Sequence, residues 1–500
     1  MRRAVLMILT GLALLTTTPG ADAQTITTSL PYATAFRGAT TFQTAGLPVS
    51  TVVGYTRVQP ASSTTPSGLV YLQSRQNKVL VAEAGVTGTS GLLSGRIYIE
   101  FNGSVNTAIA FANPNPSAVA VSISLTDQFG NDLGSPGLVV NANVQTAKFV
   151  SEAPFSVRPG FAGTLTFTST APIAVVALRT LVNEQSQFLF TPETVTPIPT
   201  SLSLGTQIIP HFADAGGWRT RLVLVNPTDQ TISGVVQFFG EGTTTVPATP
   251  LTLNVNGAVN SSFGYSIRPR SSTSFDTLGL VSSATRLGSI QITPAGGTTA
   301  PAAFAVLSFV SNGVTVSQTT VETQALGTTF RSFVELNSTQ AKPGVTQDAL
   351  AIANSSVTPA TVNFELLNGD GTTTGFTASI IVPGFGHAAI FVHELFPTFN
   401  LIPQQDVPFR GLIRITSFSS IAVANFRTHF NELGNFLMTS TVTTIEGSPS
   451  TNAELFFPQI LDGGGFTTQF VLFSGVADQA TTGTLRFVSQ NGQALGLSFP

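Results

Sequence analysis

Apolar and polar residues alternate one by one along much of the chain. Between 119 and 125, Val, Val, Ile and Leu take the odd positions, while Ala and Ser take the even ones. The same alternation runs through 164–168, 362–366 and 485–487. Because successive side chains of a strand point to opposite faces, this pattern predicts half-buried antiparallel strands.

Turn signals separate these runs. Asn131-Asp132, Asn368–Gly371 and Asn491-Gly492 each follow a predicted strand, and these residue types favour tight hairpin turns. No stretch combines a helical spacing of apolar residues with capping residues at its ends. We therefore expect an all-β fold of antiparallel sandwiches, with about seven strands per ~100 residues.

The chain repeats itself at the length of a domain. An apolar strand that ends in Asn occurs at 107–113, 220–226 and 348–354, and a fourth copy at 468–474 ends in Ser. A second block, which begins with Gly, occurs at 163–168, 288–293 and 411–416, with a looser copy at 54–59. Repeats of this size indicate one sandwich per copy.

The copies fall into two alternating types. In the type that we call Y, residues 41–47 match residues 274–280. In the other, type X, the segment Arg179–Glu184 matches Arg427–Glu432, which lies 248 residues further on.

These matches divide the chain into a leader and five parts. The predicted parts are a signal peptide at 1–23, the second half of a Y domain at 24–90, an X domain at 91–200, a Y domain at 201–325, an X domain at 326–447 and the first half of a Y domain at 448–500. We expect immunoglobulin-like sandwiches in an extended array. The two half-domains could also complete one sandwich, within a ring or between successive chains, because half-sandwiches have open strand edges.

The N-terminus has the pattern of an export signal. Arg2 and Arg3 precede an apolar run from 4 to 15, and the small residues Ala21-Asp22-Ala23 precede Gln24. No later segment offers about 18 uninterrupted apolar residues, so we expect no transmembrane helix. The chain has no cysteine, so each domain must be held by its own core rather than by disulfides. We therefore predict a secreted or cell-surface protein.

Charge is scarce. Charged residues make up 9% of the chain and the net charge is −3, against a usual charged fraction of about 25%. Nucleic acids and anionic membranes require clustered Lys and Arg, so the sequence argues against both as partners. The high apolar content argues against disorder.

These features resemble those of uncharacterised bacterial secreted proteins with tandem immunoglobulin-like β-sandwich repeats. The resemblance covers the chain beyond the leader. It rests on the strand-to-Asn block, the turn at Asp214–Trp218 and the Arg-Thr-x-x-Asn-Glu segment of the X domains. It supplies no catalytic residues that could be transferred to this chain, and we predict no cofactor.

The titratable residues show no motif for catalysis or metal binding. The histidines are His211, His387, His393 and His429, and none has a metal-ligand spacing. The segment Asp127–Asp132 has some features of a calcium loop but lacks its closing Glu, so a hairpin turn is the stronger prediction. We therefore predict no metal site and no catalytic site.

Charged residues that recur in register predict structural ion pairs. The candidates are Arg179, Glu184 and Glu152 in the first X domain, with Arg427, Glu432 and Glu394 in the second. Because buried charges must be paired, we expect Arg179 to bond to Glu152 or Glu184.

Trp218 and Phe466 are the candidate ligand contacts. Each follows a Gly-Gly turn at an equivalent place in a Y domain. An exposed aromatic ring there could stack on a sugar, whereas a buried one would plug the end of a sandwich core.

The sequence thus favours a structural or adhesive repeat protein, a modular spacer or interaction scaffold rather than an enzyme. Its partner would be an extracellular protein or polysaccharide surface, with head-to-tail self-association through the terminal halves as a further possibility. Two alternatives stay open: an array of carbohydrate-binding modules, and the non-catalytic region of a longer extracellular enzyme.

Overall fold

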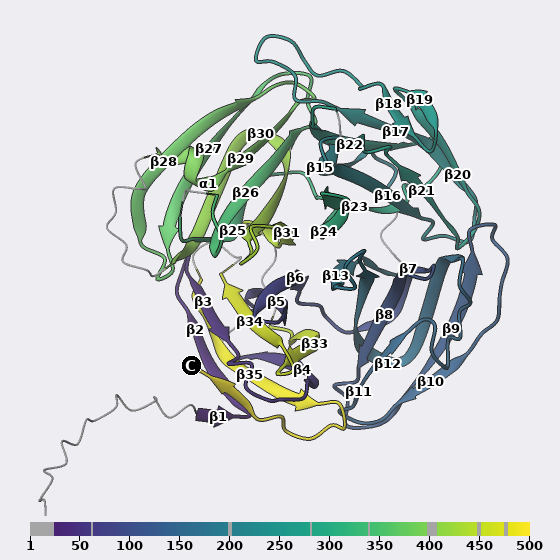
Figure 1. Cartoon of the computed structure of the whole chain (residues 1–500), viewed down its shortest axis with the longest axis vertical. Helices are drawn as coiled ribbons and strands as arrows, with labels where there is room; N and C mark the ends of the chain where they lie inside the picture. Colours follow the sequence, from purple (N-terminus) through teal and green to yellow (C-terminus); the bar gives the residue numbers. More distant parts are fainter. Residues whose placement is uncertain are drawn as a thin grey trace, which may run out of the picture.

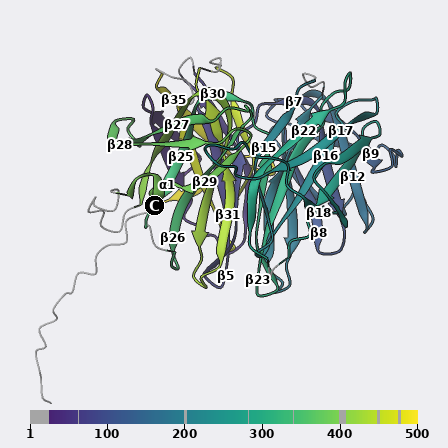
Figure 2. The ribbon, with the colours of Figure 1, turned by 90° about the horizontal axis from the view of Figure 1, so that it is seen from above.

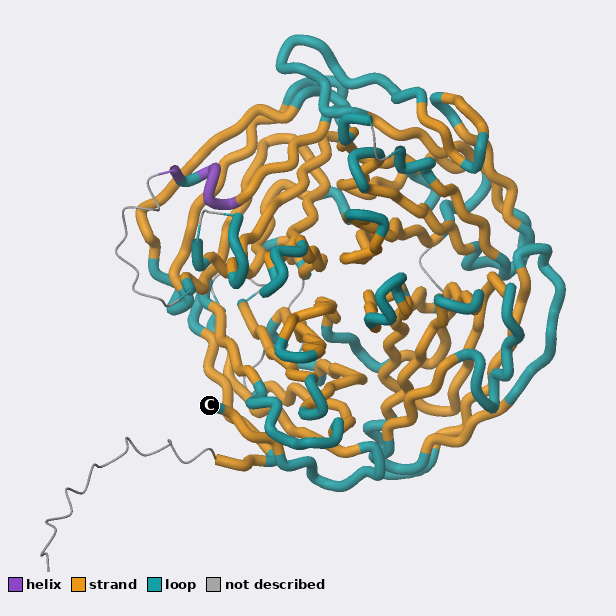
Figure 3. The backbone as a smooth tube through the Cα atoms, viewed as in Figure 1, coloured by secondary structure: helices purple, strands orange, loops and turns teal. Residues whose placement is uncertain are grey.

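The computed structural model describes residues 25–61, 64–198, 203–280, 283–338, 341–397, 408–447, 452–474 and 479–500. The predicted signal peptide lies outside these residues. The regular secondary structure of the described residues is strand apart from one short helix, α1 (Val392–Leu395) (Figure 3). The predicted all-β class is therefore confirmed.

Four sandwich modules, which we call A to D, surround a central axis (Figure 1). Module A consists of β7 (Leu92–Phe101), β8 (Val105–Ala112), β9 (Val119–Asp127), β10 (Gly137–Val140), β11 (Gln145–Phe149), β12 (Phe161–Val182), β13 (Phe188–Glu193) and β14 (Val195–Pro197). Module B consists of β15 (Gln207–Asp214), β16 (Trp218–Val225), β17 (Ile232–Phe239), β18 (Leu253–Val255), β19 (Ala258–Asn260), β20 (Phe263–Ile267), β21 (Ser272–Asp276), β22 (Arg286–Pro294), β23 (Ala302–Ser311) and β24 (Val314–Glu322).

The other two modules complete the ring. Module C consists of α1 with β25 (Gly327–Leu336), β26 (Val345–Asn354), β27 (Ala360–Asn368), β28 (Thr373–Val382), β29 (His387–Phe391), β30 (Phe409–Phe430), β31 (Phe436–Thr441) and β32 (Thr443–Ile445). Module D combines β1 (Thr25–Thr27), β2 (Ser29–Thr34), β3 (Ala39–Gln43), β4 (Val52–Pro60), β5 (Ser67–Gln76) and β6 (Val79–Thr87) with β33 (Leu455–Asp462), β34 (Phe466–Phe473), β35 (Thr481–Ser489) and β36 (Leu497–Phe499).

All four modules share one strand order. In module B the two sheets are β15-β22-β17-β20 and β21-β16-β23-β24. In modules A and C, a single long strand, β12 or β30, runs through both sheets and occupies the positions that β22 and β23 occupy in module B. The first part of β12, for example, pairs with β7 and β9, and its second part pairs with β8 and β13.

This order is not the immunoglobulin one. In an immunoglobulin domain the first strand lies beside the second, and the seventh lies beside the sixth. Here β15 pairs with β22, and β23 pairs with β16. The two edge strands have in effect exchanged sheets, so the immunoglobulin-like organisation expected from the sequence is not confirmed.

Module D is built from both ends of the chain. Its sheets are β33-β4-β35-β2 and β3-β34-β5-β6, in which N-terminal and C-terminal strands alternate along most of each sheet. The expected extended array is therefore wrong. The half-domains complete one sandwich within a single chain, and the strand edges that head-to-tail pairing between chains would use are already hydrogen-bonded.

The repeated Asn at the end of the apolar strand fixes the turn that follows. In module B, Asn226 Nδ2 donates to the backbone carbonyls of Gln230, Ile267 and Arg268. Asn113 and Asn354 bond in the same way in modules A and C. Several of these carbonyls are buried and need a donor, and one amide group at this position supplies it to three carbonyls at once.

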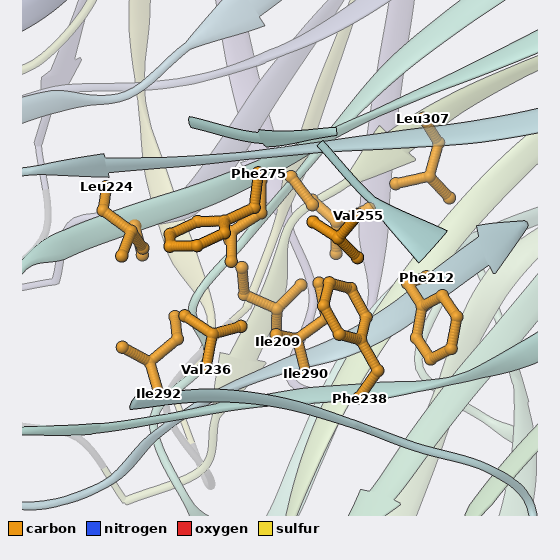
Figure 4. Close-up of a cluster of buried hydrophobic side chains, with 14 of the residues drawn as sticks. Ile209, Phe212, Leu224, Val236, Phe238, Val255, Phe275, Ile290, Ile292 and Leu307 are labelled. Atoms are coloured by element: carbon orange, nitrogen blue, oxygen red, sulfur yellow. The ribbon is translucent and has the colours of Figure 1, made fainter. Parts of the chain in front are cut away.

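Each module has its own apolar core between its two sheets. In module B, Phe212, Phe238 and Ile290 are fully buried, together with Leu224 and Ile292 (Figure 4). These side chains come from both sheets. Alternate residues along the strands therefore point into the core, as the sequence pattern predicts.

The long strands run in the direction of the ring axis (Figure 2). One edge strand of the inner sheet of each module, namely β6, β13, β24 and β31, lies nearest the axis (Figure 1), and neighbouring ones contact each other. The outer sheets face away from the axis. Within the described part of the chain, we find no helix with the length and apolarity needed to cross a bilayer, as predicted.

Candidate functional sites in the seams and on the axis

The interfaces between neighbouring modules, which we call seams, are of two kinds because X and Y modules alternate. Seams A/B and C/D are held by charged groups. Seams B/C and D/A are held by aromatic rings and paired polar side chains. The ring therefore has an approximate twofold symmetry, and each seam can be compared with its counterpart.

Buried ion pairs hold seam A/B. Arg179 Nη1 lies 2.7 Å from Glu100 Oε2, and both side chains are almost fully buried. Arg221, from module B, approaches the same oxygen at 3.0 Å and also pairs with Asp276. Burial acts to raise the pKa of Glu100, but the two guanidinium groups outweigh it and hold that pKa below its usual value.

Seam C/D repeats this arrangement with one change. Arg427 lies 3.5 Å from both Glu335 and Glu83 and donates to Gln469 Oε1 at 2.7 Å. Gln469 stands where Arg221 stands in seam A/B. The Arg427 guanidinium also lies over the ring of Tyr71, 4.4 Å from its centroid.

The predicted partners of these arginines lie elsewhere. Glu152 accepts a hydrogen bond from the backbone N of Phe149, and Glu394 does the same with Phe391, so both stabilise a turn within their own module. Arg179 bonds to neither Glu152 nor Glu184. The predicted pairing rested on position alone. It was wrong because the partner, Glu100, lies on β7, whereas the part of β12 that carries Arg179 pairs with β8 and β13.

Glu184 and Glu432 connect modules instead. Glu184 accepts hydrogen bonds from the backbone N and the hydroxyl of Thr315 in module B. Glu432 accepts from the backbone N of Leu80 and from Arg75 in module D. The preceding residues, Asn183 and Asn431, donate to the carbonyls of the same two partners. The recurring Asn-Glu pair therefore binds the strand of the next module that lies nearest the axis, β24 or β6.

A histidine pair lies buried in seam B/C. His211 Nδ1 and His387 Nε2 share a hydrogen bond at 3.1 Å, and the rings are stacked. In seam D/A the same two positions hold Gln459 and Gln145, and Gln145 Nε2 donates to Gln459 Oε1 at 2.6 Å. Since glutamine replaces histidine at the matching place, this pair acts as a structural contact.

Burial lowers the pKa of both histidines. That of His211 falls to about 4, and that of His387 falls well below its usual value, with a further decrease from the neighbouring His211. The remaining two histidines lie apart from this pair: His393 packs on Phe391, and His429 shares a hydrogen bond with Thr346.

Trp218 and Phe466 line the two aromatic seams. Trp218 packs on Phe309 at 4.8 Å and lies edge-on to Phe436 of module C. Phe466 packs on Phe190 of module A at 6.4 Å. The glycine before each ring has a positive φ, and a Cβ on Gly217 would meet the carbonyl oxygen of Val310 at 2.6 Å. The tight turn that these glycines allow directs both rings into a seam.

The two aromatic seams are filled differently. In seam D/A a cavity of about 350 Å³ lies among Phe466, Phe188, Phe190 and Leu178. In seam B/C the strand register puts Phe309 and Phe426 where seam D/A has Ser74 and Leu178. The candidate contact Phe466 thus lines an apolar cavity, whereas Trp218 lies against rings of its own protein.

A second cavity, of about 410 Å³, lies on the ring axis and is lined by all four modules. Its walls carry many threonine hydroxyls and two carboxyl groups, those of Glu193 and Glu322. Thr194 donates to Glu322 at 2.7 Å. Glu193 is 4% exposed, and the side chain of Thr107 acts to lower the pKa of its carboxyl group.

The environment of Glu193 favours its neutral form. Burial raises the pKa of this carboxyl to about 8, and the Arg179 guanidinium offsets the effect only in part. At neutral pH Glu193 is therefore mostly protonated.

The described residues contain no group of three or more His, Cys, Asp or Glu that could hold a metal ion. In the segment tested as a calcium loop, both oxygens of Asp127 accept hydrogen bonds from Asn131, and one also accepts from the backbone N of Phe129. The carboxylate is used by the turn itself, in line with the prediction of a hairpin turn.

Sequence inspection missed Glu100, Glu335, Arg96 and Arg331. All four lie on the first strand of an X module, where Arg-x-x-x-Glu recurs at 96–100 and 331–335. These two copies are 235 residues apart, whereas the matching segments in the second half of the X modules are 248 residues apart. Aligning the chain with itself at an offset of 248 therefore does not reveal them.

Comparison with known proteins identifies no family. No family model matches the chain, and no curated protein matches it. Among solved structures, Thermotoga maritima 1070 matches with 9% identity over 21% of this chain and 94% of that chain, at a TM-score of 0.18. The triple jelly roll and turret protein of an archaeal virus has 12% identity over 83% and 91%, at a TM-score of 0.14, and the PBSX exported protein XepA has 9% over 42% and 85%, at 0.13. None of these likenesses is close enough to define a function. The fold and seams define the class, a single-chain closed ring of four β-sandwich modules.

Proposed function

We propose that this protein is an exported, non-catalytic scaffold, a rigid ring that presents binding surfaces outside the cell. The observation that carries the proposal is the completion of module D by the two ends of the chain. Because every module then has two neighbours, loosening any one module breaks hydrogen bonds and apolar contacts in two seams.

The seams support a rigid assembly. The chain has few charged residues, and many of them lie in seams rather than on the outer surface: Arg179, Glu100, Arg427 and Glu335 are examples. Buried charge pairs tolerate little displacement, because a partner that moves away leaves an uncompensated charge. Fixed module positions are what a scaffold or adhesive surface requires, and no disulfide is needed to maintain them.

Export is tested by location and by the mature N-terminus. In the native host, we expect the protein in the extracellular, periplasmic or surface fraction, with Gln24 as its first residue by mass spectrometry. A cytosolic protein that keeps Met1 would contradict the proposal.

Scaffold function is tested by binding. The purified ring is incubated with isolated envelope polysaccharide and with envelope protein, and bound protein is measured against concentration. We expect saturable binding to one of the two. A matched variant in which Phe470 and Leu472 are both changed to Asp, so that module D cannot close, is expected to lose this binding. Equal binding by the opened variant, or turnover of an envelope polymer by the intact ring, would refute the proposal.

The alternative of a carbohydrate-binding array rested on Trp218 as an exposed platform. Trp218 is packed between Phe309 and Phe436, at interplanar angles of 33° and 80°, and offers no flat row of exposed rings. This geometry favours the scaffold over a stacking site at that position.

A further inference from the structure

A groove that contains many serine and threonine side chains follows seam A/B beside the arginine Arg96. Its volume is about 580 Å³, and its walls carry the hydroxyl groups of Ser94, Ser122, Ser124, Thr166 and Thr168 from module A. Module B contributes Asp229 and Arg270. No comparable density of hydroxyl groups lines the apolar cavity of seam D/A.

Arg96 lies at the base of this groove and is 3% exposed. Its Nε donates to Thr166 Oγ1 at 2.7 Å, and its Nη1 donates to the carbonyl oxygen of Asn226 at 2.6 Å. These contacts are to neutral groups. Among the ion pairs of the described residues, none involves Arg96.

The counterpart of Arg96 in seam C/D does have a carboxylate. Arg331 occupies the same position on β25 and donates through Nη1 to the carbonyl oxygen of Ser474, as Arg96 does to Asn226. Its Nε, however, donates to Glu446 Oε1 at 2.6 Å, and Arg414 binds the same carboxylate.

Ile198 stands where Glu446 would be. The backbone N of Glu446 donates to the carbonyl oxygen of Thr329 at 3.0 Å, and the backbone N of Ile198 donates to that of Ser94 at the same distance. Thr166 likewise takes the place of Arg414, opposite the arginine on the neighbouring strand. Seam A/B therefore keeps the buried arginine and lacks the internal carboxylate that neutralises it in seam C/D.

The charges around the groove leave it positive. Asp229 and Arg270 form an exposed ion pair with each other at 2.6 Å, so their charges largely cancel. Burial lowers the pKa of Arg96 to about 10, with Asp229 opposing the decrease from a distance. A buried guanidinium without a carboxylate is unfavourable, and an anion that enters the groove relieves that cost.

We propose that this groove binds the carboxylate of a hydroxyl-rich ligand, a uronic acid unit, with Arg96 as its anchor. The ligand's carboxylate takes the place that Glu446 fills in seam C/D. The Thr166 hydroxyl accepts from Arg96 and keeps its own proton to donate to that carboxylate. The serine and threonine hydroxyls along the walls bond to the hydroxyl groups of the sugar. The site stands whether or not the protein is exported.

The test uses isothermal titration of the full ring with a glucuronic-acid oligosaccharide, glucuronic acid itself and a neutral glucose oligosaccharide of equal length. We expect the first to bind and the neutral one to bind at least about tenfold more weakly, equivalent to 1.4 kcal/mol. Binding by the monomer alone assigns the site to a free sugar acid, whereas tighter binding by the oligomer assigns it to a polysaccharide. Equal affinity for charged and neutral oligosaccharides would overturn the proposal.

The matched variants are Ile198→Glu and Ile198→Gln. The first supplies the internal carboxylate of seam C/D and is expected to weaken uronate binding by at least about tenfold, with an unchanged fold by circular dichroism. The second has the same length without the charge and is expected to keep binding. Unchanged uronate affinity in Ile198→Glu would refute the site, and this test does not depend on the stability of an Arg96 variant.

Discussion

Arg57 Nη2 and Glu454 Oε2 form an ion pair at 2.8 Å, although 397 residues separate them in the sequence. Arg57 also donates through Nε to the same carboxylate. The pair lies in module D, where the N-terminal and C-terminal parts of the chain meet. It is one of many contacts that join these two parts, and the predictions below test what that closure and the seams contribute.

A circular permutant is expected to keep the ring. Thr25 pairs with Phe499 in the antiparallel β1–β36 ladder, so a short turn can join residue 500 to residue 25. New termini between Pro197 and Gln207 lie between β14 and β15 and interrupt no strand. We expect a folded monomer with a melting temperature close to that of the parent, measured by circular dichroism and light scattering. A permutant opened inside β12, between Thr168 and Ser169, is the control that should fail. Failure of both would contradict a closed ring.

Loss of the Arg179 side chain is expected to destabilise the ring. Arg179→Ala leaves the buried Glu100 with Arg221 as its one charged partner beside the Asn102 amide, and breaking a buried pair costs ~3–5 kcal/mol. Because one partner stays, we expect about 3 kcal/mol, measured by urea unfolding. Arg158 is exposed, so the control Arg158→Ala should change stability by less than ~0.5 kcal/mol. Equal unfolding curves for the two variants would exclude the buried pair.

The histidine pair makes seam B/C sensitive to acid. Both pKa values are lowered in the folded state, that of His211 to about 4. The stability they support is present above the unfolded pKa of ~6.5 and is lost as pH falls from there toward about 4. The double variant His211→Gln with His387→Gln copies seam D/A. We expect it to unfold less readily than the parent at pH 4.5 and similarly at pH 7.5. If the stability difference between the double variant and the parent were the same at pH 4.5 and pH 7.5, the histidine pair would not be the source of the acid sensitivity.

Glu193 is expected to destabilise the ring in alkali. Its pKa is raised to about 8 in the folded state, so its contribution is fully present below the unfolded pKa of ~4.3 and is lost as pH rises through about 8. Glu193→Gln removes this loss and should be more stable than the parent at pH 9, by a few kcal/mol, with little difference near pH 4. The exposed carboxylate of Glu241 gives the control, Glu241→Gln. If the stability difference between Glu193→Gln and the parent were the same at pH 4 and pH 9, Glu193 would titrate normally and the prediction would be wrong.

The strands and turns of this fold could be predicted because their information is local. The alternation at 119–125 became β9, and the Asn-ended blocks became strands whose Asn fixes the next turn. The division into X and Y types likewise follows from matches between short segments. Such patterns report which residues face a core and where the chain turns.

Strand order and closure could not be predicted in the same way. The pairing of β15 with β22 joins residues that are 72 to 85 positions apart in the sequence. Apolar alternation along β15 would be the same if β15 paired with β16 instead. The exchange of edge strands distinguishes these modules from immunoglobulin domains, but it produces no short sequence pattern that could have predicted it. The partner of Arg179 was missed for a related reason, since Glu100 follows a different repeat offset and lies on another strand.

The most direct test of the closed ring is a disulfide between its two ends. Ser29 of β2 and Arg486 of β35 are directly opposite each other and exposed, and the chain has no cysteine of its own. The neighbouring pair Thr28 and Phe487 is hydrogen-bonded, so Ser29 and Arg486 form the closer, non-bonded pair with Cα atoms ~4.5 Å apart, within the range for a disulfide.

The variant Ser29→Cys with Arg486→Cys is oxidised and run on a non-reducing gel, beside the control Ser29→Cys with Asn256→Cys, whose second site lies in module B. We predict that the test variant gives a cross-linked monomer that migrates faster than its reduced form, while the control gives none. Covalent dimers and ladders in place of that monomer would show that the ends pair between chains and would contradict the closed ring.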